Sequence, residues 1–461
     1  MRPGRISGAG IALLGATLTL VGCGGSSPTI ETPTKPVTPA ATALRGEVFG
    51  GQQPVTGMTL QLYETGNSGY GSAATGLLST PLPVTDSNGD FSFSTPTCHQ
   101  STDQAYLVGT GGDPLAGNST YNNSPAANPN LALMVALGPC TGLDSITHLH
   151  MNELTTVAAV WALAPFMTGN TQSYLNIGTS STNSTGLQLA FEAAEEVANI
   201  STGTLPGTLP ANGTLPTDEL NEIADILEDC INSKGGTEGD GSFCGNLFAA
   251  APSGSGYPTD VITAAMNIAQ NPARGVSTLY GIGSATSAFQ PGLGSAPAAW
   301  TVAIQYSGGG LNAPSALAAD QSGNIWVINS GGASVSQFNN AGTPNAAFGT
   351  NGLSLGATPG GLAIDLSGNA WITTSANNIL EVNPGGSVAK TVTDPSLNAP
   401  TSVAIDGGGN LWVVNSGGNS VSEFNSSGAV LSGSGFTGGG ISAPVSIAIN
   451  GNANANCADC N

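Results

Sequence analysis

The 461-residue sequence contains few charged residues, and positive charge is the scarcest of all. Charged side chains make up 8% of the chain, whereas about a quarter is usual in globular proteins. Seven lysines and arginines accompany 28 aspartates and glutamates, so the formal net charge is −21. Proteins that bind nucleic acid neutralise phosphates with clustered basic residues, and these seven are scattered. The sequence therefore predicts no nucleic-acid partner and no electrostatic attachment to anionic lipids.

Apolar runs long enough to cross a bilayer are also lacking at the N-terminus. The apolar segment 11–21 follows Arg2 and Arg5, and about 20 apolar residues are needed to span the hydrocarbon core. A short apolar segment behind a positively charged start is typical of a secretory signal peptide. We therefore expect residues 1–22 to be removed on export.

The signal segment ends in Leu20-Val21-Gly22-Cys23, which resembles the bacterial lipobox. The resemblance implies that Cys23 receives a diacylglyceryl group, that cleavage follows Gly22, and that the new amine is acylated. Two or more chains give stable anchoring, since each buried methylene contributes about 0.8 kcal/mol. Residues 23–42, rich in proline and threonine, would then tether the folded chain to a membrane of the cell envelope, on the periplasmic side or at the cell surface. An ordinary signal peptide with a chance cysteine is the alternative.

The six other cysteines fit an exported chain, in which an even number favours disulfides. The pairs that proximity in sequence suggests are Cys98–Cys140 and Cys230–Cys244. Cys457 and Cys460 form a C-x-x-C sequence whose pairing stays open. A terminal bridge is one interpretation, and half of a zinc site is a weaker one because two more ligands would be needed.

Residues 43–140 show a β pattern, because apolar and polar residues alternate over 58–63 and a turn sequence at 86–90 precedes a strand. The segment resembles the carboxypeptidase regulatory-like β-sandwich, which implies a spacer or binding module. The matching residues are Gly46-Glu47-Val48, Pro54-Val55-Thr56-Gly57, Leu62-Tyr63 and Thr85 to Phe91. The 86–90 run also looks like part of an EF-hand loop. The bidentate glutamate and flanking helices of that motif are lacking, so a turn is favoured.

Residues 141–297 change to a helical pattern and predict a small helical bundle. Apolar residues recur at helical spacing after Thr217 and after Thr259. His148, His150 and Glu153 spell His-x-His-x-x-Glu, which invites a metal-site interpretation. No further ligand is evident nearby, and Glu153 is expected to begin a helix. A role at a domain junction or on the surface is therefore favoured, and no metal site is predicted.

Residues 298–461 repeat a unit of about 40 to 45 residues, the spacing of propeller blades. The three copies are Ala313 to Val327, Thr358 to Ile372 and Ala399 to Val413. Each contains two strands joined by a D-x-x-G-N turn, and a third strand follows. The copies resemble NHL-type repeats and the related virginiamycin B lyase-like blades of β-propellers. The resemblance implies a fold and leaves the function open.

Recurring residues in these copies are interpreted as structural. Asp320, Asp365 and Asp406 occupy one slot in which a carboxylate can accept turn N–H groups, and the tryptophans at 326, 371 and 412 would pack between blades. A fourth copy begins at Pro444 and then fails. The sequence therefore predicts a partial propeller of three repeats plus a fragment, in which residues 301–305 are a candidate strand for the last blade.

The expected fold is multidomain and mainly β, with a β-sandwich, a helical bundle and a partial propeller. Reactive side chains are sparse, since the blades lack histidine and Gly352-Leu353-Ser354-Leu355-Gly356 is interpreted as a chance G-x-S-x-G match. We therefore expect a membrane-anchored binding or structural module for a protein or carbohydrate ligand, with no catalytic residues and no cofactor. The alternative is a propeller lyase or lactonase with a metal site.

Overall fold

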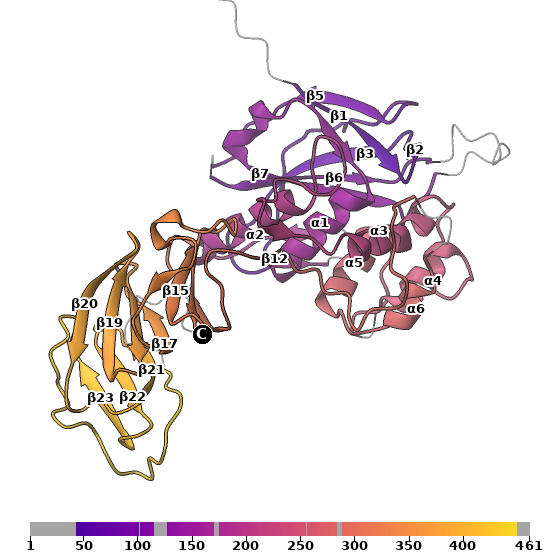
Figure 1. The fold of residues 1–461 in the computed structure, drawn as a ribbon. Coiled ribbons are helices and arrows are strands. Elements are labelled where there is room, and N and C mark those ends of the chain that lie inside the picture. The colour runs from indigo at the N-terminus through magenta and orange to yellow at the C-terminus, as the bar shows by residue number, and fades with distance from the viewer. Residues whose placement is uncertain are drawn as a thin grey trace, which may run out of the picture. The chain divides into compact units, whose positions relative to one another are not determined.

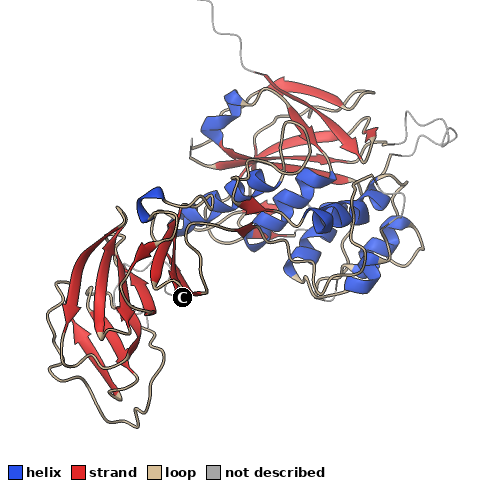
Figure 2. Ribbon diagram, in the orientation of Figure 1, coloured by secondary structure: helices blue, strands red, loops and turns tan. Residues whose placement is uncertain are grey.

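The computed structural model describes residues 43–100, 102–114, 127–169, 175–254, 256–283 and 288–449 (Figures 1 and 2). The chain divides into two units, residues 1–41 and 42–461, and the elements below belong to the second. Cys23, Cys457 and Cys460 lie outside the described residues. Among the residues that are described, no helix is both long and apolar enough to cross a membrane.

Two sheets form from residues 43–151, and the expected alternation of side-chain burial is seen in β1 and β3, whereas β6 and β7 are buried at nearly every position. In the first sheet β1 pairs antiparallel with β2 and β5 and parallel with β8. Its strands are β1 (Ala43–Gly50), β2 (Gln53–Pro54), β5 (Asp90–Ser94) and β8 (Leu149–Met151). The second is antiparallel in the order β4-β3-β6-β7. Its strands are β3 (Thr59–Glu64), β4 (Thr75–Gly76), β6 (Gln104–Thr110) and β7 (Ala132–Pro139).

The helices pack against the second sheet, and α1, α2 and α5 all contact β7 (Figure 1). Strand β7 is therefore buried along almost its whole length, as its uninterrupted apolar sequence requires. Asn152 begins α1 with a capping box, and Asp260 caps α5. The α-helices are α1 (Glu153–Leu163), α2 (Ser184–Val197), α3 (Thr217–Ile231), α4 (Phe243–Ala250), α5 (Val261–Gln270) and α6 (Val276–Tyr280). The 3-10 helices are η2 (Cys140–Ser145), η3 (Ala164–Phe166), η4 (Ser181–Asn183) and η5 (Ala346–Phe348).

One cluster of buried apolar side chains runs through both sheets and the helices, from Leu44 to Trp300. Tyr106 of β6 donates its hydroxyl to the carbonyl of Leu175 at 2.7 Å, and the Trp161 indole donates to the Trp300 carbonyl at 3.0 Å. Two-stranded pairs complete this region: β9 (Met167–Thr168) with β10 (Asn176–Ile177), and β11 (Gly213–Thr214) with β12 (Gln305–Tyr306). The sheets and helices thus share a core, and the boundary between residues 140 and 141 stays a prediction.

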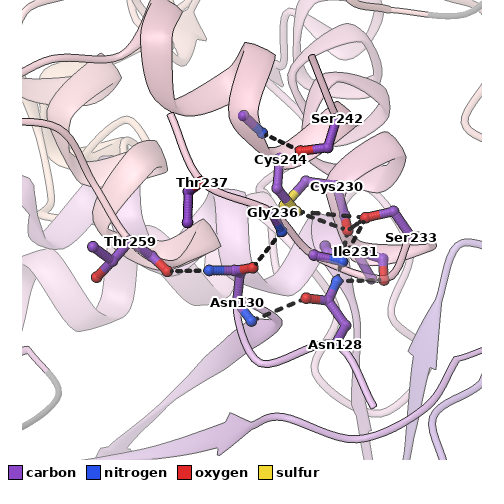
Figure 3. Close-up of a disulfide and its surroundings, with 12 residues drawn as sticks. Asn128, Asn130, Cys230, Ile231, Ser233, Gly236, Thr237, Ser242, Cys244 and Thr259 are labelled. Atoms are coloured by element: carbon purple, nitrogen blue, oxygen red, sulfur yellow. Dashed lines mark hydrogen bonds between the residues drawn. A yellow bond between two sulfur atoms is a disulfide. The ribbon is translucent and has the colours of Figure 1, made fainter. Parts of the chain in front are cut away.

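Two disulfides join the pairs that the sequence suggested, Cys98–Cys140 and Cys230–Cys244. Both cysteines of the second pair are fully buried, and Figure 3 shows their disulfide close to Asn128. Asn128 donates its side-chain amide to the carbonyls of Cys230 and Ile231, at 2.7 and 3.1 Å, where α3 ends and leaves carbonyls without helical partners. The disulfide thus fixes the end of α3 to the first turn of α4, and Asn128 fixes it to the segment that precedes β7.

Three antiparallel sheets form the propeller-like blades from residue 314 onward. Blade 1 has four strands, β13 (Pro314–Ala319), β14 (Ile325–Asn329), β15 (Ser334–Phe338) and β16 (Leu353–Ser354). Blade 2 has four, β17 (Pro359–Ile364), β18 (Ala370–Thr374), β19 (Asn378–Asn383) and β20 (Ser387–Thr393). Blade 3 has three, β21 (Pro400–Ile405), β22 (Leu411–Asn415) and β23 (Ser420–Phe424).

The blades do not close into a ring within the described residues. Residues 441–449, where the fourth copy begins, form no strand, and Val445 is exposed. Residues 301–305 were expected to complete the last blade. Only Gln305 of this segment lies in a strand, and for Gln305 the expectation is wrong. Gln305 pairs instead with Thr214 of β11. Strand β12 therefore pairs outside the blades.

Candidate functional site

Each blade contains the same Asp-turn-Trp arrangement, which blade 3 illustrates. Asp406 Oδ1 accepts the backbone N–H groups of Gly408 and Asn410 at 2.9 Å, and its Oδ2 accepts the Trp412 indole N–H at 3.0 Å. Gly409, at φ 80°, provides the left-handed conformation of the turn. Burial opposes ionisation of Asp406, but these hydrogen bonds outweigh it and hold its pKa below the usual value. The carboxylate therefore joins the turn to the strand behind it.

The same contacts recur at Asp320 and Asp365, whose indole partners lie at 3.2 and 3.1 Å. The interpretation of these aspartates as turn acceptors is thus supported by the geometry. The sequence did not reveal the indole contact, although the constant spacing of six residues between aspartate and tryptophan was its signal. Because both oxygens of each carboxylate are engaged, a metal ion could bind there only by breaking the turn.

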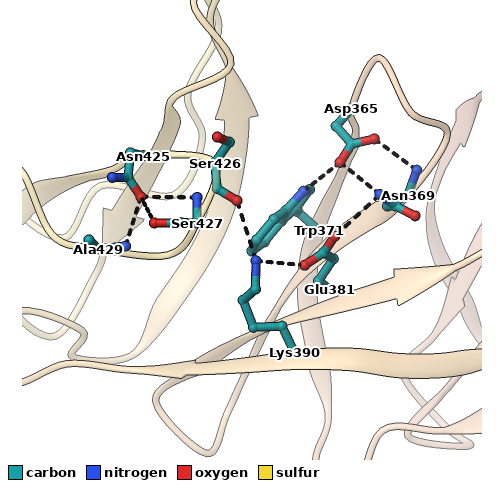
Figure 4. A network of polar contacts seen from close by, with 9 residues as sticks. All are labelled: Asp365, Asn369, Trp371, Glu381, Lys390, Asn425, Ser426, Ser427 and Ala429. Atoms are coloured by element: carbon teal, nitrogen blue, oxygen red, sulfur yellow. Dashed lines mark hydrogen bonds and ion pairs between the residues drawn. The ribbon is translucent and has the colours of Figure 1, made fainter.

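Blade 2 adds a polar network around Trp371 (Figure 4). Lys390 Nζ lies 2.9 Å from Glu381 Oε2 and 5.1 Å from the centre of the Trp371 ring. Asn369 donates its amide to both Asp365 and Glu381, at 3.1 and 3.2 Å. Glu381 is thereby committed to an ion pair and a hydrogen bond. Its role in this structure is to hold strands together.

The three repeat tryptophans differ in how they are covered. Trp326 is 0% exposed and packs in one cluster with Ala370 and Ile372 of blade 2. Trp371 is 1% exposed and packs in a second cluster with residues of blade 3. Each of these two rings therefore lies on the following blade, as expected for packing between blades.

Trp412 of blade 3 is only partly buried. Its ring stacks on Phe436 at a centroid distance of 5.9 Å, and Phe436 is itself 46% exposed. Phe436 is held in place because its backbone exchanges hydrogen bonds with Val421 of β23, at 2.7 and 3.0 Å. We call Trp412 and Phe436 the blade-3 face. It presents an ordered pair of aromatic rings to solvent in the described part of the chain.

The 86–90 run and the G-x-S-x-G string, two further motifs from the sequence analysis, form a turn and part of a short strand. Asp86 Oδ1 accepts the N–H groups of Asn88 and Asp90 at 2.8 and 3.0 Å, so this segment is a turn. Ser354 of the G-x-S-x-G string lies in the short strand β16, paired with β15. It does not occupy the strand-to-helix elbow that exposes a nucleophile.

The two histidines of the His-x-His-x-x-Glu sequence do meet a carboxylate, but it is not Glu153. His148 and His150 both contact Glu47 of β1, whereas Glu153 begins α1 and is fully buried. Glu153 Oε1 accepts the Gly51 N–H at 2.8 Å. Sequence reasoning missed Glu47 because parallel pairing of β1 with β8 brings it across about a hundred residues, beyond any local pattern.

A row of carboxylates on α3 was also missed. Glu222, Asp225 and Glu228 accept backbone N–H groups of Leu293, Phe289 and Ala288, at 3.1, 3.0 and 3.2 Å respectively. Their spacing of three residues places them along one face of the helix, and this spacing was the available signal. Burial raises the pKa of Glu222. The row attaches the segment 288–293 to the helix.

A cleft of about 560 Å³ lies beside α5 and is lined by Met167, Tyr257, Asp260 and Met266 among others. Among the described residues that line it, Asp260 is the one acid. The Asp260 carboxylate accepts the N–H and hydroxyl of Thr263, at 2.8 and 2.7 Å, and burial raises its pKa. This carboxylate acts as the cap of α5.

No family model and no curated protein matches the chain. Comparison with solved structures gives propeller-like neighbours. A streptogramin B lyase structure shares 18% identity over 29% of this chain and 43% of its own, with a TM-score of 0.25. The virginiamycin B lyase of Staphylococcus aureus shares 22% over 26% and 40%, with a TM-score of 0.23. A gluconolactonase of Xanthomonas campestris shares 21% over 28% and 48%, with a TM-score of 0.22. This chain spans less than half of each, and such TM-scores carry no argument about its activity.

Proposed function

We propose that the chain is a lipoprotein of the bacterial cell envelope, anchored through Cys23, that binds a protein or carbohydrate ligand through its blades. The observation that carries the binding role is the blade-3 face, where Trp412 and Phe436 stack and remain partly exposed. Aromatic rings contribute large contact areas at a small entropic cost, both against proteins and against sugar rings. The carboxylates of Asp320, Asp365, Asp406 and Glu381, by contrast, are engaged in holding turns and strands.

The remaining modules fit the same role. Residues 23–42 would act as a tether, and the β-sandwich of carboxypeptidase regulatory-like type would act as a spacer. Membrane attachment would come from the acyl chains, because five scattered cations in the mature chain cannot attract an anionic surface. The proposed location is the periplasmic side of a membrane or the cell surface.

Anchoring is tested by changing Cys23 to serine. We expect Cys23→Ser to abolish incorporation of labelled fatty acid and to leave residues 1–22 uncleaved, because both steps depend on the thiol. Labelling and the N-terminal residue of the purified protein are measured in the native host. Cys457→Ser is the matched control and should be labelled normally. Continued labelling of Cys23→Ser with cleavage after Gly22 would show that the anchor is elsewhere.

Binding is tested by placing a photo-crosslinking amino acid at position 436 of the full chain in the native envelope. We expect a discrete crosslinked partner that is lost when Trp412 is changed to alanine. Leu366, which is 65% exposed but lies in a turn, is the matched control position and should give no such product. Identical products from both positions would contradict the proposed binding face.

A carbohydrate ligand would be detected differently. Envelope glycan fragments should then change the tryptophan fluorescence of the wild-type protein, and Trp412→Ala should remove that response. The alternative function, a lyase or lactonase with a metal site, requires turnover. Opening of a lactone substrate by the full chain in the presence of a divalent metal would contradict a purely binding role.

A further inference from the structure

Two of the three histidines in the chain converge on one carboxylate at the edge of the first sheet. Strand β8 lies parallel to β1, with His150 opposite Glu47. Alternate residues of a strand point to the same side, so His148 lies on that side as well. His150 Nδ1 is 2.8 Å and His148 Nε2 is 3.5 Å from the same atom, Glu47 Oε1.

The His150 ring is held rigidly in this arrangement. It stacks on Phe49 at a centroid distance of 5.2 Å, and its backbone N–H donates to the carbonyl of Ile200 at 2.7 Å. Gly203 lies so close to the ring edge that a Cβ there would collide with His150. Asn152 holds Gly203 by donating its amide to the Gly203 carbonyl at 2.9 Å. These contacts cover the Nε2 edge and leave Nδ1 directed at Glu47.

The side chains of His148 and Glu47 are less tightly packed than that of His150. The His148 side chain is 44% exposed and has room to rotate, whereas that of His150 is only 17% exposed. The Glu47 side chain is 31% exposed, and the formal charges of its strand neighbours Asp90 and Arg45 offset each other.

We propose that Glu47, His148 and His150 bind a divalent transition-metal ion of the zinc type. Imidazole nitrogen and carboxylate oxygen are the ligands that such ions take, and two histidines with one carboxylate leave a position for water. The imidazoles contact the shared oxygen rather than each other. Binding therefore requires the half-exposed His148 ring to rotate towards the ion. The ion would replace the hydrogen bonds that now join the imidazole nitrogens to the Glu47 carboxylate.

Rival sites in the chain can be separated from this one. Glu64, Cys98 and Cys140 bring ligand atoms within 4.8 Å of one another, but both sulfurs are in the disulfide and offer no thiolate. Cys457 and Cys460 lie outside the described residues, and as free thiols they would form a competing pair of ligands. The experiment must therefore exclude thiolate ligation.

The test is calorimetric titration of the oxidised full chain with zinc alone, at neutral pH and with excess magnesium to occupy exposed carboxylates. We expect one saturable zinc site, with affinity reduced at least about 10-fold in His148→Ala and in Glu47→Gln. Neither change threatens folding, because His148 is half-exposed and glutamine is isosteric with glutamate. Cobalt bound in place of zinc should show a spectrum of nitrogen and oxygen ligands without thiolate charge transfer.

Two controls make the result specific. His99 also contacts a carboxylate, Glu64, at 2.5 Å, but it is a lone histidine, so His99→Ala should leave zinc affinity unchanged. The double variant Cys457→Ser/Cys460→Ser should likewise bind normally. The proposal is overturned if no zinc site saturates, if His148→Ala binds as tightly as wild type, or if the double variant loses the site.

Discussion

Replacing Trp371 with alanine is expected to lower the free energy of unfolding of the blades by about 3–5 kcal/mol, the usual loss for a buried tryptophan. Trp371 is 1% exposed and packs against Val403, Leu411 and Phe424 across the boundary between blades 2 and 3. Its removal leaves a cavity that two rigid sheets cannot close, so the cavity cost adds to the lost burial.

Trp412→Ala is the matched control, and it should cost less, about 1.5–3 kcal/mol, the order of one hydrogen bond to a charged group. Both indoles donate to the aspartate of their own turn, at 3.1 and 3.0 Å, so both variants lose the same hydrogen bond. The difference between the variants therefore combines the burial of Trp371 between blades and its contact with Lys390, less the stacking of Trp412 on Phe436.

The measurement is native-state hydrogen exchange of the full chain, because a single global transition cannot be assumed for several structural regions. Peptides from β18 and β22 should lose protection in Trp371→Ala, whereas peptides from β6 and β7 serve as internal references. Equal losses for the two variants would mean that the blade-3 face is covered in solution. The proposed binding face would then have to be reconsidered.

The blades were largely predictable because their signals are local. The D-x-x-G-N turn, the alternating strands and the recurring tryptophan all fall within about fifteen residues, so each copy specifies its own hairpin. The same holds for Cys230 and Cys244, which close a short loop at the end of α3. Local patterns of this kind can be recognised in the sequence without knowledge of the tertiary fold.

Features that depend on distant pairing were not predictable. Glu47 and His150 meet through three parallel backbone pairs between β1 and β8, and nothing in either segment encodes that pairing. Glu153 begins α1, as the sequence predicted, and Asn152 caps that helix one residue earlier. Gln305 similarly pairs with β11 rather than with a blade, since a short strand pairs with any edge that its tertiary neighbours bring near.

Glu153 is the second residue for which a large effect is expected, because it is a fully buried acid with little compensation. Its Oε1 accepts one backbone N–H, from Gly51, and its Oε2 has no hydrogen-bond partner among the residues that the structure describes. Burial, with further contributions from Glu228 and Asp225 of α3, raises the pKa of Glu153 to about 8. The protonated acid is therefore the form that the folded chain accepts at neutral pH.

The direction of the pH dependence follows from this raised pKa. An unfolded glutamate titrates at about 4.5, so below that pH both states are protonated and the stabilisation is complete. Between about 4.5 and about 8 the unfolded chain has lost the proton and the folded chain keeps it, so the free energy of unfolding falls as pH rises. Asp229, whose pKa burial raises to about 6, contributes in the same direction.

We therefore expect the free energy of unfolding to fall on the order of 3–4 kcal/mol between pH 5 and pH 8 through Glu153 alone, at about 1.4 kcal/mol per pKa unit. Glu153→Gln should remove this part of the slope and stabilise the chain at pH 8, while changing little at pH 5, where glutamine resembles the protonated acid. Urea unfolding followed by the circular dichroism of the helices measures it. Glu238→Gln, which removes the same charge from an exposed loop, is the control and should keep the wild-type slope. An unchanged slope in Glu153→Gln would show that Glu153 is ionised in the folded chain and that its burial is relieved by water or by a bound cation.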